Sequence, residues 1–401
     1  MKKKIAILGS TGSIGKSLLN LVSENKKSFH VTLLTANKNY NELIKQAKLF
    51  NVKNIILKDK KSFLIAKSKI KNNKIKIYNN FEQFNEIFKK KKIDYVMSSI
   101  VGIDGLYPTF KIIKYTKKIA IANKESIICA WNLINKELKK NNTNFVPVDS
   151  EHFSIWYGNG QKFVNNIKKI HLTASGGSLL NTPINQINKL SLKKILKHPN
   201  WSMGHKITID SSTLMNKVFE VIETKKIFNI NYKNINILIH PDSYVHAIIE
   251  FSNGMIKLIA HNTTMIIPIG NTIYEDNFKI KKNEAINIKK LNNLNFNLVD
   301  FKKFPLIKII EKLPEKDSLF ETVLVAANDE LVDLYLKQKI KYNDIRLNLV
   351  KIVEKKEFNK YKKILPRKIL DVIKLGDYVR LKIRNSLSWI LVLNLLNFLL
   401  Q

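Results

Sequence analysis

The sequence contains a single cysteine and no long apolar run. Cys129 stands alone among 401 residues, which excludes a disulfide framework within the monomer and indicates a reducing compartment. Residues 1–8 lead straight into an expected strand, without the apolar region and cleavage site of a secretory signal. The most apolar stretch, 389–400, is shorter than the roughly twenty residues that span a bilayer. We therefore expect a cytoplasmic protein with a terminal helix that packs in a core or dimer contact; a weak membrane contact of this tail is the alternative.

Acidic residues are also scarce. The chain has 32 aspartates and glutamates against 69 lysines and arginines, which gives a formal net charge of +37. Clustered cations neutralise phosphates, so this charge is compatible with nucleic-acid binding. However, the lysines are spread through nearly every segment, together with asparagine and isoleucine. This distribution favours a compositional bias and solvated surfaces over a nucleic-acid or membrane interface.

Length and patterning predict an α/β protein with several domains. A hydrophobic content of 45% over 401 residues is enough for two or three cores. In the first half, short β-branched runs alternate with helical patterns, which indicates an N-terminal Rossmann-like parallel sheet. The expected strands are 5–8, 31–35, 54–57, 95–98, 119–122 and 144–148.

The pattern changes near residue 149 to a central α+β catalytic domain. It contains an expected strand at 170–173 and a hairpin of strands 244–251 and 255–260 that turns at Asn253 and Gly254. Helical periodicity at 321–336 and 366–384 indicates a C-terminal helical bundle. The expected segments are a nucleotide-binding domain (1–148), a catalytic domain (149–274), a linker (275–299), a helical bundle (300–385) and an apolar tail (386–401).

A glycine-rich loop follows the first expected strand. Gly9, Gly12 and Gly15 have the spacing Gly-x-x-Gly-x-x-Gly and precede a helical pattern. Glycines permit a tight turn and a close backbone approach, and a helix N-terminus offers N–H groups to a pyrophosphate. A plain structural turn is the alternative. We predict dinucleotide binding by Thr11, Gly12, Ser13 and Ile14.

The second expected strand ends without an acidic residue. NAD-selective sites usually place a carboxylate there to bind the ribose 2′-hydroxyl. Here the strand is followed by Asn37, Lys38 and Asn39, so no carboxylate repels a 2′-phosphate and Lys38 carries the charge to pair with it. This favours NADPH, although Lys38 is also compatible with an ordinary surface lysine.

Asp149 and Glu151 follow the sixth expected strand, at an edge of the sheet where ligands bind. In extended backbone, residues two apart point to the same side, so both carboxylates can converge on one cation. A solvated turn is the alternative for such a pair. We predict a metal site that includes both residues.

A second polar cluster runs from Asp210 to Glu220. Asp210 or Ser211 can cap a helix start, and Asn216 and Glu220 then share one face with Lys217 beside them. Hydroxyls, an amide and an ammonium suit a phosphate, and Glu220 can complete the metal shell. A capped amphipathic helix without a ligand is the alternative.

Two loops complete the candidate site. Ser175 precedes two glycines after a strand and can offer its hydroxyl and nearby backbone N–H groups to a phosphate, as any tight turn could. Residues 198–204 combine the His198 imidazole, the Trp201 ring and a final Gly204, which is typical of a lid that excludes water. A loop whose Trp201 packs into the core is the alternative.

These motifs resemble a known family, the 1-deoxy-D-xylulose 5-phosphate reductoisomerases. The resemblance runs from Lys4 to about Leu381, and the motifs follow one another in the family's order. They are 9–15, 122–126, 147–152, 175–177, 198–204, 210–220 and 239–241.

The resemblance implies a homodimer that uses NADPH and Mg²⁺ or Mn²⁺. By this resemblance, the enzyme rearranges 1-deoxy-D-xylulose 5-phosphate by retro-aldol cleavage and re-addition. NADPH then reduces the resulting aldehyde to 2-C-methyl-D-erythritol 4-phosphate, in the non-mevalonate route to isoprenoids. The metal acts as a Lewis acid in such chemistry.

The family's residue roles carry over position by position. The implied metal ligands are Asp149, Glu151 and Glu220, and the implied catalytic residues add Lys124 and His198. The implied substrate-binding residues are Lys124, Ser150, Glu151, Ser175, His198, Trp201, Ser211, Asn216, Lys217 and Glu220. The cofactor-binding residues are Thr11, Gly12, Ser13, Ile14, Asn37, Lys38, Asn39, Asn123, Glu125 and Gly204.

Three positions depart from the family pattern. Asn37 replaces a usual glycine, and His205 stands where an arginine often follows the lid glycine. The segment 263–268 lacks a usual proline, aspartate and arginine. These departures concern the lid and turnover, while the metal and phosphate residues match the family.

Two other functions remain open at this point. The first is another NADP-dependent dehydrogenase of a small phosphorylated or semialdehyde substrate, which would work without metal. Acylating semialdehyde dehydrogenases need a nucleophilic cysteine in the catalytic domain, whereas Cys129 falls in an expected helix of the nucleotide domain. The second is a nucleic-acid-binding protein, which would show a steeply salt-dependent affinity.

Overall fold

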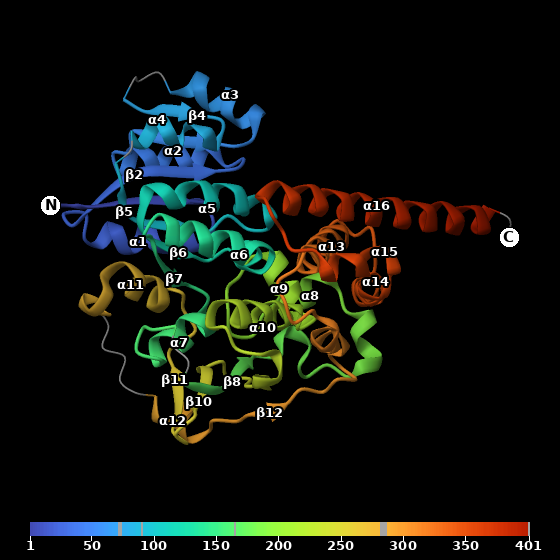
Figure 1. Ribbon diagram of the computed structural model, residues 1–401. Coiled ribbons are helices and arrows are strands. Elements are labelled where there is room, and N and C mark those ends of the chain that lie inside the picture. Colours follow the sequence, from blue (N-terminus) through green and yellow to red (C-terminus); the bar gives the residue numbers. More distant parts are fainter. Residues whose placement is uncertain (71–73, 90, 164–165, 281–286, 400–401) are drawn as a thin grey trace. The chain divides into compact units, whose positions relative to one another are not determined.

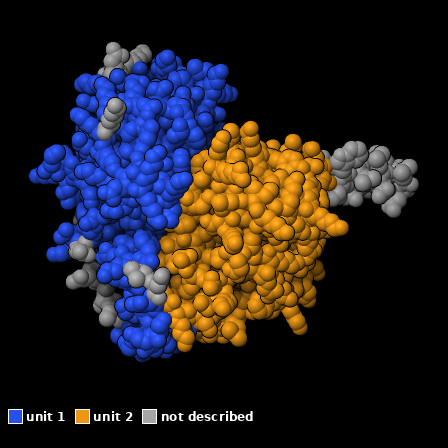
Figure 2. All heavy atoms as spheres, viewed as in Figure 1, with its two compact units in different colours: residues 1–126, 134–166, 244–293 blue, residues 127–133, 167–243, 294–401 orange. Residues whose placement is uncertain are grey.

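The computed structural model describes residues 1–70, 74–89, 91–163, 166–280 and 287–399. The chain forms two compact units, which Figure 2 shows in different colours. Unit 1 comprises residues 1–126, 134–166 and 244–293, and unit 2 comprises residues 127–133, 167–243 and 294–401.

Unit 1 contains a seven-stranded parallel sheet in the order β4-β3-β2-β1-β5-β6-β7. The order reverses between β1 and β5, so the loops after these strands flank a switch point, where ligands bind in such sheets. All six strands expected in this half are confirmed, whereas the short and partly exposed β4 was not predicted. The strands are β1 (Lys3–Leu8), β2 (Phe29–Ala36), β3 (Asn54–Leu57), β4 (Lys76–Tyr78), β5 (Ile93–Ser98), β6 (Thr116–Ile121) and β7 (Asn144–Pro147).

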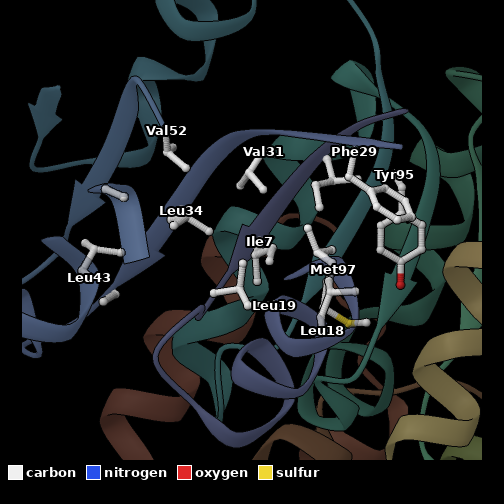
Figure 3. Close-up of a cluster of buried hydrophobic side chains, with 14 of the residues drawn as sticks. Ile7, Leu18, Leu19, Phe29, Val31, Leu34, Leu43, Val52, Tyr95 and Met97 are labelled. Atoms are coloured by element: carbon white, nitrogen blue, oxygen red, sulfur yellow. The ribbon is translucent and has the colours of Figure 1, made fainter. Parts of the chain in front are cut away.

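The core of this sheet consists of apolar side chains from strands and helices (Figure 3). Ile7 on β1 and Leu18 on the following helix are both fully buried. Burial of each such side chain contributes about 1.5–3 kcal/mol. The helices are α1 (Ser13–Glu24), α2 (Tyr40–Leu49), α3 (Lys60–Lys69), α4 (Phe84–Phe88), α5 (Leu106–Ile112) and α6 (Lys124–Lys140).

A later segment of the chain returns to the same core. Helix α11 (Ile266–Tyr274) contributes the buried Ile269 and Ile273. The Tyr95 hydroxyl on β5 lies 2.7 Å from the Thr272 hydroxyl, and both residues are buried. Because residues before and after the catalytic motifs share one core, unit 1 is discontinuous in sequence.

The hairpin expected after residue 244 is confirmed in unit 1. β10 (Val245–Phe251) pairs antiparallel with β11 (Ile256–Ala260), and Gly254 in the turn has a φ of +86° that favours glycine. Helix α7 (Ser150–Gly158) packs against this hairpin, and Lys257 Nζ donates a hydrogen bond to the carbonyl of Gly158 at 3.0 Å.

Unit 2 combines strands with a helical C-terminal region (Figure 1). β8 (Ile167–Ala174) pairs parallel with β9 (Ile235–Ile239), and β9 pairs antiparallel with β12 (Asn297–Leu298). The expected helices at 321–336 and 366–384 are confirmed. The main helices are α8 (Leu192–Ile195), α9 (His205–Ser212), α10 (Met215–Phe228), α13 (Phe320–Leu336), α14 (Tyr342–Glu354), α15 (Lys356–Asn359) and α16 (Ile369–Leu399).

Two local predictions were wrong. Asp149 does not continue a strand; it is the N-cap of α7, so Ser150 and Glu151 lie in the first helical turn. Asp210 and Ser211 do not cap a helix start either, since they lie near the end of α9, and α10 begins after Leu214 without a side-chain cap. Leu214 has a φ of +57°, so a left-handed residue separates the two helices.

The segment 275–299 is not wholly a linker. It contains α12 (Ile288–Asn292) and the whole of β12, while residues 281–286 lie outside the described residues. The apolar tail continues α16 to Leu399, and the side chains from residue 388 onward lie outside the description. Among the described helices, none has the length and apolar content needed to cross a membrane.

Candidate functional site

The glycine-rich loop has the geometry of a tight turn before a helix. Gly9 has a φ of +86°, and a Cβ there would lie 2.9 Å from the carbonyl oxygen of Ser99. A Cβ on Gly15 would lie 2.5 Å from the carbonyl oxygen of Gly9. Gly12 is the N-cap of α1 and provides no side-chain cap, and both Gly12 and Ser13 are exposed. This helix terminus is therefore accessible to an anion.

Polar residues follow β2 on the surface of unit 1. Asn37, Lys38 and Asn39 are exposed, and Asn39 Oδ1 accepts from the backbone N–H of Glu42 at 3.2 Å to cap α2. The Asp59 carboxylate interacts electrostatically with Lys38. Hydrogen bonds from Ser62, followed by the nearby lysines, hold the pKa of Asp59 below its ordinary value. That carboxylate caps α3.

The segment 122–126 positions Lys124. Asn123 is buried; its Oδ1 accepts from the Ser126 backbone N–H at 2.7 Å, and its Nδ2 donates to the carbonyl of Gly102 at 2.9 Å. These bonds fix the start of α6. Lys124 Nζ then lies 2.6 Å from Asp149 Oδ2, and both side chains are largely buried. The ion pair places a cation beside one of the predicted metal ligands.

Asp149, Ser150 and Glu151 form an acidic turn in unit 1. Asp149 Oδ1 accepts from the Ser150 backbone N–H at 3.0 Å, and Ser150 Oγ donates to Glu151 Oε2 at 2.5 Å. The positive end of a helix dipole stabilises carboxylates near the helix N-terminus. The start of α7 therefore stabilises the charges of Asp149 and Glu151, although these residues do not lie in an extended strand.

His261 directly follows β11 in unit 1, near the acidic turn. Its ring stacks on that of His246 with the centroids 3.7 Å apart, and its Nδ1 lies 2.8 Å from the carbonyl oxygen of Asn262. Burial lowers the pKa of His261, and the charge of Glu151 opposes this shift. No spacing motif marks His261, because only the folded hairpin brings it within the field of Glu151.

Unit 2 brings three of the predicted polar residues together. The His198 Nε2 atom lies 3.1 Å from Ser175 Oγ and 3.2 Å from Ser211 Oγ. Ser175 Oγ also accepts from the Gly177 backbone N–H at 3.0 Å. Gly177 has a φ of +62°, and a Cβ there would lie 2.7 Å from the Ser211 carbonyl oxygen, so only glycine lets this loop approach the end of α9.

The other His198 nitrogen defines its tautomer. Nδ1 accepts from the backbone N–H groups of Asn200 at 3.2 Å and Trp201 at 3.0 Å. A nitrogen that accepts carries no proton, so in the neutral ring Nε2 carries it and donates to a serine hydroxyl. Burial, and then the charge of Lys217, lower the pKa of His198 to about 4. His198 is therefore a neutral donor at neutral pH.

The expected arrangement on α10, with Asn216 and Glu220 on one face and Lys217 beside them, is confirmed. Lys217 Nζ lies 2.5 Å from Glu220 Oε2 and donates to the Thr173 carbonyl at 2.6 Å, and Asn216 Nδ2 donates to Glu220 Oε1. Lys217 and Glu220 are buried. A buried lysine is stable only with such partners, so this cation is held firmly at the end of β8.

The lid residues are less constrained. Trp201 is half-buried, whereas Gly204 is exposed and a Cβ there would meet no atom within 4 Å. Asn200 is anchored by its Nδ2, which donates to Ser243 Oγ at 2.9 Å. The segment 198–204 is thus held by hydrogen bonds at its beginning and exposed to solvent at Gly204.

Family models match most of the chain. A model described as 1-deoxy-D-xylulose 5-phosphate reductoisomerase matches residues 5–131, and the model of that enzyme's C-terminal domain matches residues 145–228. A model described as the DXP reductoisomerase C-terminal domain matches residues 261–380.

Individual relatives agree with these matches. The chain is 58% identical over 382 residues to the 1-deoxy-D-xylulose 5-phosphate reductoisomerase of Pelagibacter ubique (strain HTCC1062), covering 95% of this chain and 98% of the relative. It is 36% identical over 388 residues to that of Clostridium tetani (strain Massachusetts / E88), covering 95% and 99%.

Solved structures also match along nearly the whole chain. The reductoisomerase from Zymomonas mobilis in complex with NADPH has a TM-score of 0.83 at 29% identity, covering 96% of this chain and 99% of that one. A structure of DOX-P reductoisomerase in complex with NADPH, fosmidomycin and magnesium has a TM-score of 0.85 at 28% identity, covering 96% and 97%.

Proposed function

The chain belongs to the family of 1-deoxy-D-xylulose 5-phosphate reductoisomerases, and on that premise we propose which of its residues carry the reaction. The enzyme converts 1-deoxy-D-xylulose 5-phosphate to 2-C-methyl-D-erythritol 4-phosphate in the non-mevalonate isoprenoid pathway, with NADPH and a divalent metal ion as cofactors. The observation that carries the residue assignment is the partly buried polar cluster of Ser175, His198, Ser211 and Lys217.

The substrate phosphate is held by this cluster. Ser175 and Ser211 offer hydroxyls, His198 offers the Nε2 proton, and Lys217 supplies a buried positive charge. Asn216 adds an amide that now binds Glu220. Charge-assisted hydrogen bonds to phosphate are stronger than neutral ones, so Lys217 contributes most to phosphate affinity.

The divalent cation is bound by Asp149, Glu151 and Glu220. Mg²⁺ and Mn²⁺ prefer oxygen ligands, and three carboxylates supply these. In unit 1, Asp149 already pairs with the cation of Lys124, and in unit 2 Glu220 pairs with that of Lys217, so both carboxylates lie where positive charge stabilises them. These residues fit a hard cation, which when bound supplies Lewis acidity at the substrate's carbonyl and hydroxyl oxygens.

The protein side chains orient the reacting end of the substrate. Lys124 Nζ donates hydrogen bonds toward oxygens that gain negative charge during bond cleavage, and the Ser150 hydroxyl fixes the Glu151 carboxylate that faces them. Anchoring of the phosphate at the other end restricts the substrate to a productive position. The lid residues Trp201 and Met203 exclude water.

The cofactor lies along the N-terminal loop. The backbone of Thr11 to Ile14 at the exposed start of α1 binds the pyrophosphate, and Asn37 to Asn39 bind the adenosine 2′-phosphate. Asn123, Glu125 and Gly204 complete the cofactor contacts. The nucleotide domain corresponds to residues 1–148 and the metal and substrate domain to residues 149–274.

A single assay tests both the function and the cofactor assignment. NADPH oxidation should depend on 1-deoxy-D-xylulose 5-phosphate, stop when a chelator removes the metal, and proceed much faster than NADH oxidation. Lys38→Glu should raise the KM for NADPH by about tenfold or more, because it replaces an attraction to the 2′-phosphate by repulsion, and should change the KM for NADH little. Equal efficiency with both cofactors in the unmodified enzyme would refute the role of Lys38.

The active enzyme is a homodimer in the cytoplasm. The β10–β11 hairpin supports dimerisation, because Ile256 and Leu258 alternate on one face of β11 and are 56% and 46% exposed. Exposed apolar strand faces usually mark association surfaces. Leu258→Lys should convert the dimer to a monomer in sedimentation equilibrium, while Lys257→Glu on the opposite face should not. A monomeric unmodified enzyme at micromolar concentration would contradict this assignment.

A further inference from the structure

Lys206 lies just after the lid and pairs with two carboxylates in unit 2. Its Nζ is 2.9 Å from Asp210 Oδ2 and 3.0 Å from Asp329 Oδ1. Lys206 occupies the first turn of α9, where the helix dipole disfavours a cation, and lysine before aspartate is the weaker order of an i, i+4 pair. The stability of α9 therefore does not explain why a lysine occupies position 206. The ion pair of Lys206 with Asp329 on α13 explains it.

Asp210 is held from a second side. Its side chain is 2% exposed, and its Oδ1 accepts from Asn328 Nδ2 at 2.8 Å. Asn328 is fully buried, and its Oδ1 accepts no hydrogen bond from any described residue, which is costly for a buried amide. Asp329 in turn lies 3.5 Å from an Arg380 nitrogen on α16. The network links the end of the lid to two helices of the C-terminal region.

The network adjoins one residue of the phosphate cluster. Ser211 directly follows Asp210, and Thr213 Oγ1 donates back to the Asp210 carbonyl at 3.2 Å. The Ser211 hydroxyl is 3.2 Å from His198 Nε2, at the opposite end of the lid. A shift of Asp210 would therefore move Ser211 and the end of the lid together.

We propose that Lys206, Asp210 and Asn328 are positioning residues that hold Ser211 against the substrate phosphate and fix the C-terminal end of the lid. This inference rests on the proposed phosphate role of Ser211. None of the three needs to touch the substrate. Their loss should weaken phosphate binding more than it slows the chemical step.

Asn328→Leu tests the proposal with little change in side-chain volume. The KM for 1-deoxy-D-xylulose 5-phosphate and the inhibition constant of inorganic phosphate should both rise by about tenfold, since one hydrogen bond to a carboxylate is lost. The kcat should change by less than about twofold, and the dissociation constant of NADPH should not change. Lys206→Met should have the same effect, and Lys206→Arg should restore most of the phosphate affinity.

Lys337→Met is the matched control, because Lys337, the C-cap of α13, and Asp333 form an exposed i, i+4 pair at 2.6 Å. If Asn328→Leu lowers the melting temperature but leaves both phosphate constants unchanged, the network is only structural and the proposal is wrong. Ser211→Ala is measured in parallel. No effect of Ser211→Ala would refute the phosphate site and this inference with it, whereas an effect of Ser211→Ala without one of Asn328→Leu refutes the inference alone.

Discussion

Glu151→Gln is expected to abolish Mn²⁺ binding and turnover together. The change keeps the size of the side chain but removes one charge and a strong oxygen ligand, which hard cations require. It also replaces the carboxylate that Ser150 Oγ now orients at 2.5 Å. We expect a loss of about 2 to 4 kcal/mol in transition-state stabilisation, similar to the contribution of one preorganised electrostatic group. Calorimetric titration with Mn²⁺ and steady-state rates on one preparation measure both quantities.

Cofactor binding should survive in this variant. The NADPH residues lie on the loop between β1 and α1, so fluorescence titration should give the dissociation constant of the unmodified enzyme. The metal-free variant should be at least as stable as the unmodified protein, because it has one fewer carboxylate beside Asp149. Glu357→Gln is the control, since Glu357 is also in the first turn of a helix. Normal turnover and unchanged Mn²⁺ affinity in Glu151→Gln would exclude Glu151 as a metal ligand.

Lys217→Gln should raise the KM for 1-deoxy-D-xylulose 5-phosphate by about a hundredfold, or ~2.7 kcal/mol, the range of a charge-assisted bond to phosphate. Glutamine keeps a donor for the Thr173 carbonyl and Glu220, the two groups within 2.6 Å of Lys217 Nζ, so it limits the cost of an uncompensated buried carboxylate. Affinity for inorganic phosphate should fall by a similar factor. The dissociation constant of NADPH should not change.

Lys226→Gln is the matched control for this experiment. Lys226 is also a buried lysine on α10, and it pairs with Asp317 at 2.6 Å and Glu321 at 3.0 Å. Its loss should lower the melting temperature without changing the KM. If both variants change the KM equally, Lys217 acts through the stability of α10 and not through the phosphate. If Lys217→Gln weakens NADPH as much as substrate, the residue belongs to a different site.

Much of the fold follows from local patterns. The β-branched runs predict the strands β1, β2, β3, β5, β6 and β7 because a parallel sheet buries both faces of its strands. The Asn253-Gly254 turn predicts the hairpin because glycine tolerates its left-handed backbone. By contrast, β4 has only three residues and lysine at its start, so its place beside β3 gives no local signal.

The candidate site, like the fold, is predictable from local patterns only in part. The spacing of Asn216, Lys217 and Glu220 predicts their contacts, because one helical turn brings residues three and four apart together. The backbone of Asp149 could not be predicted in this way. An aspartate after a strand is compatible with continued extension or with an N-cap, and packing of α7 against the hairpin favours the cap.

The residue types of the site, their order and the nucleotide loop can be predicted from the amino-acid sequence, because glycine spacing and polar clusters are local features. How those residues are held depends on the folded chain. The left-handed Leu214 separates α9 from α10, the two backbone donors fix the tautomer of His198, and Asp329 reaches Lys206 from a distant helix. Each of these depends on groups that are far apart in the chain or on backbone angles set by packing, and neither is encoded in the period or composition of a short segment.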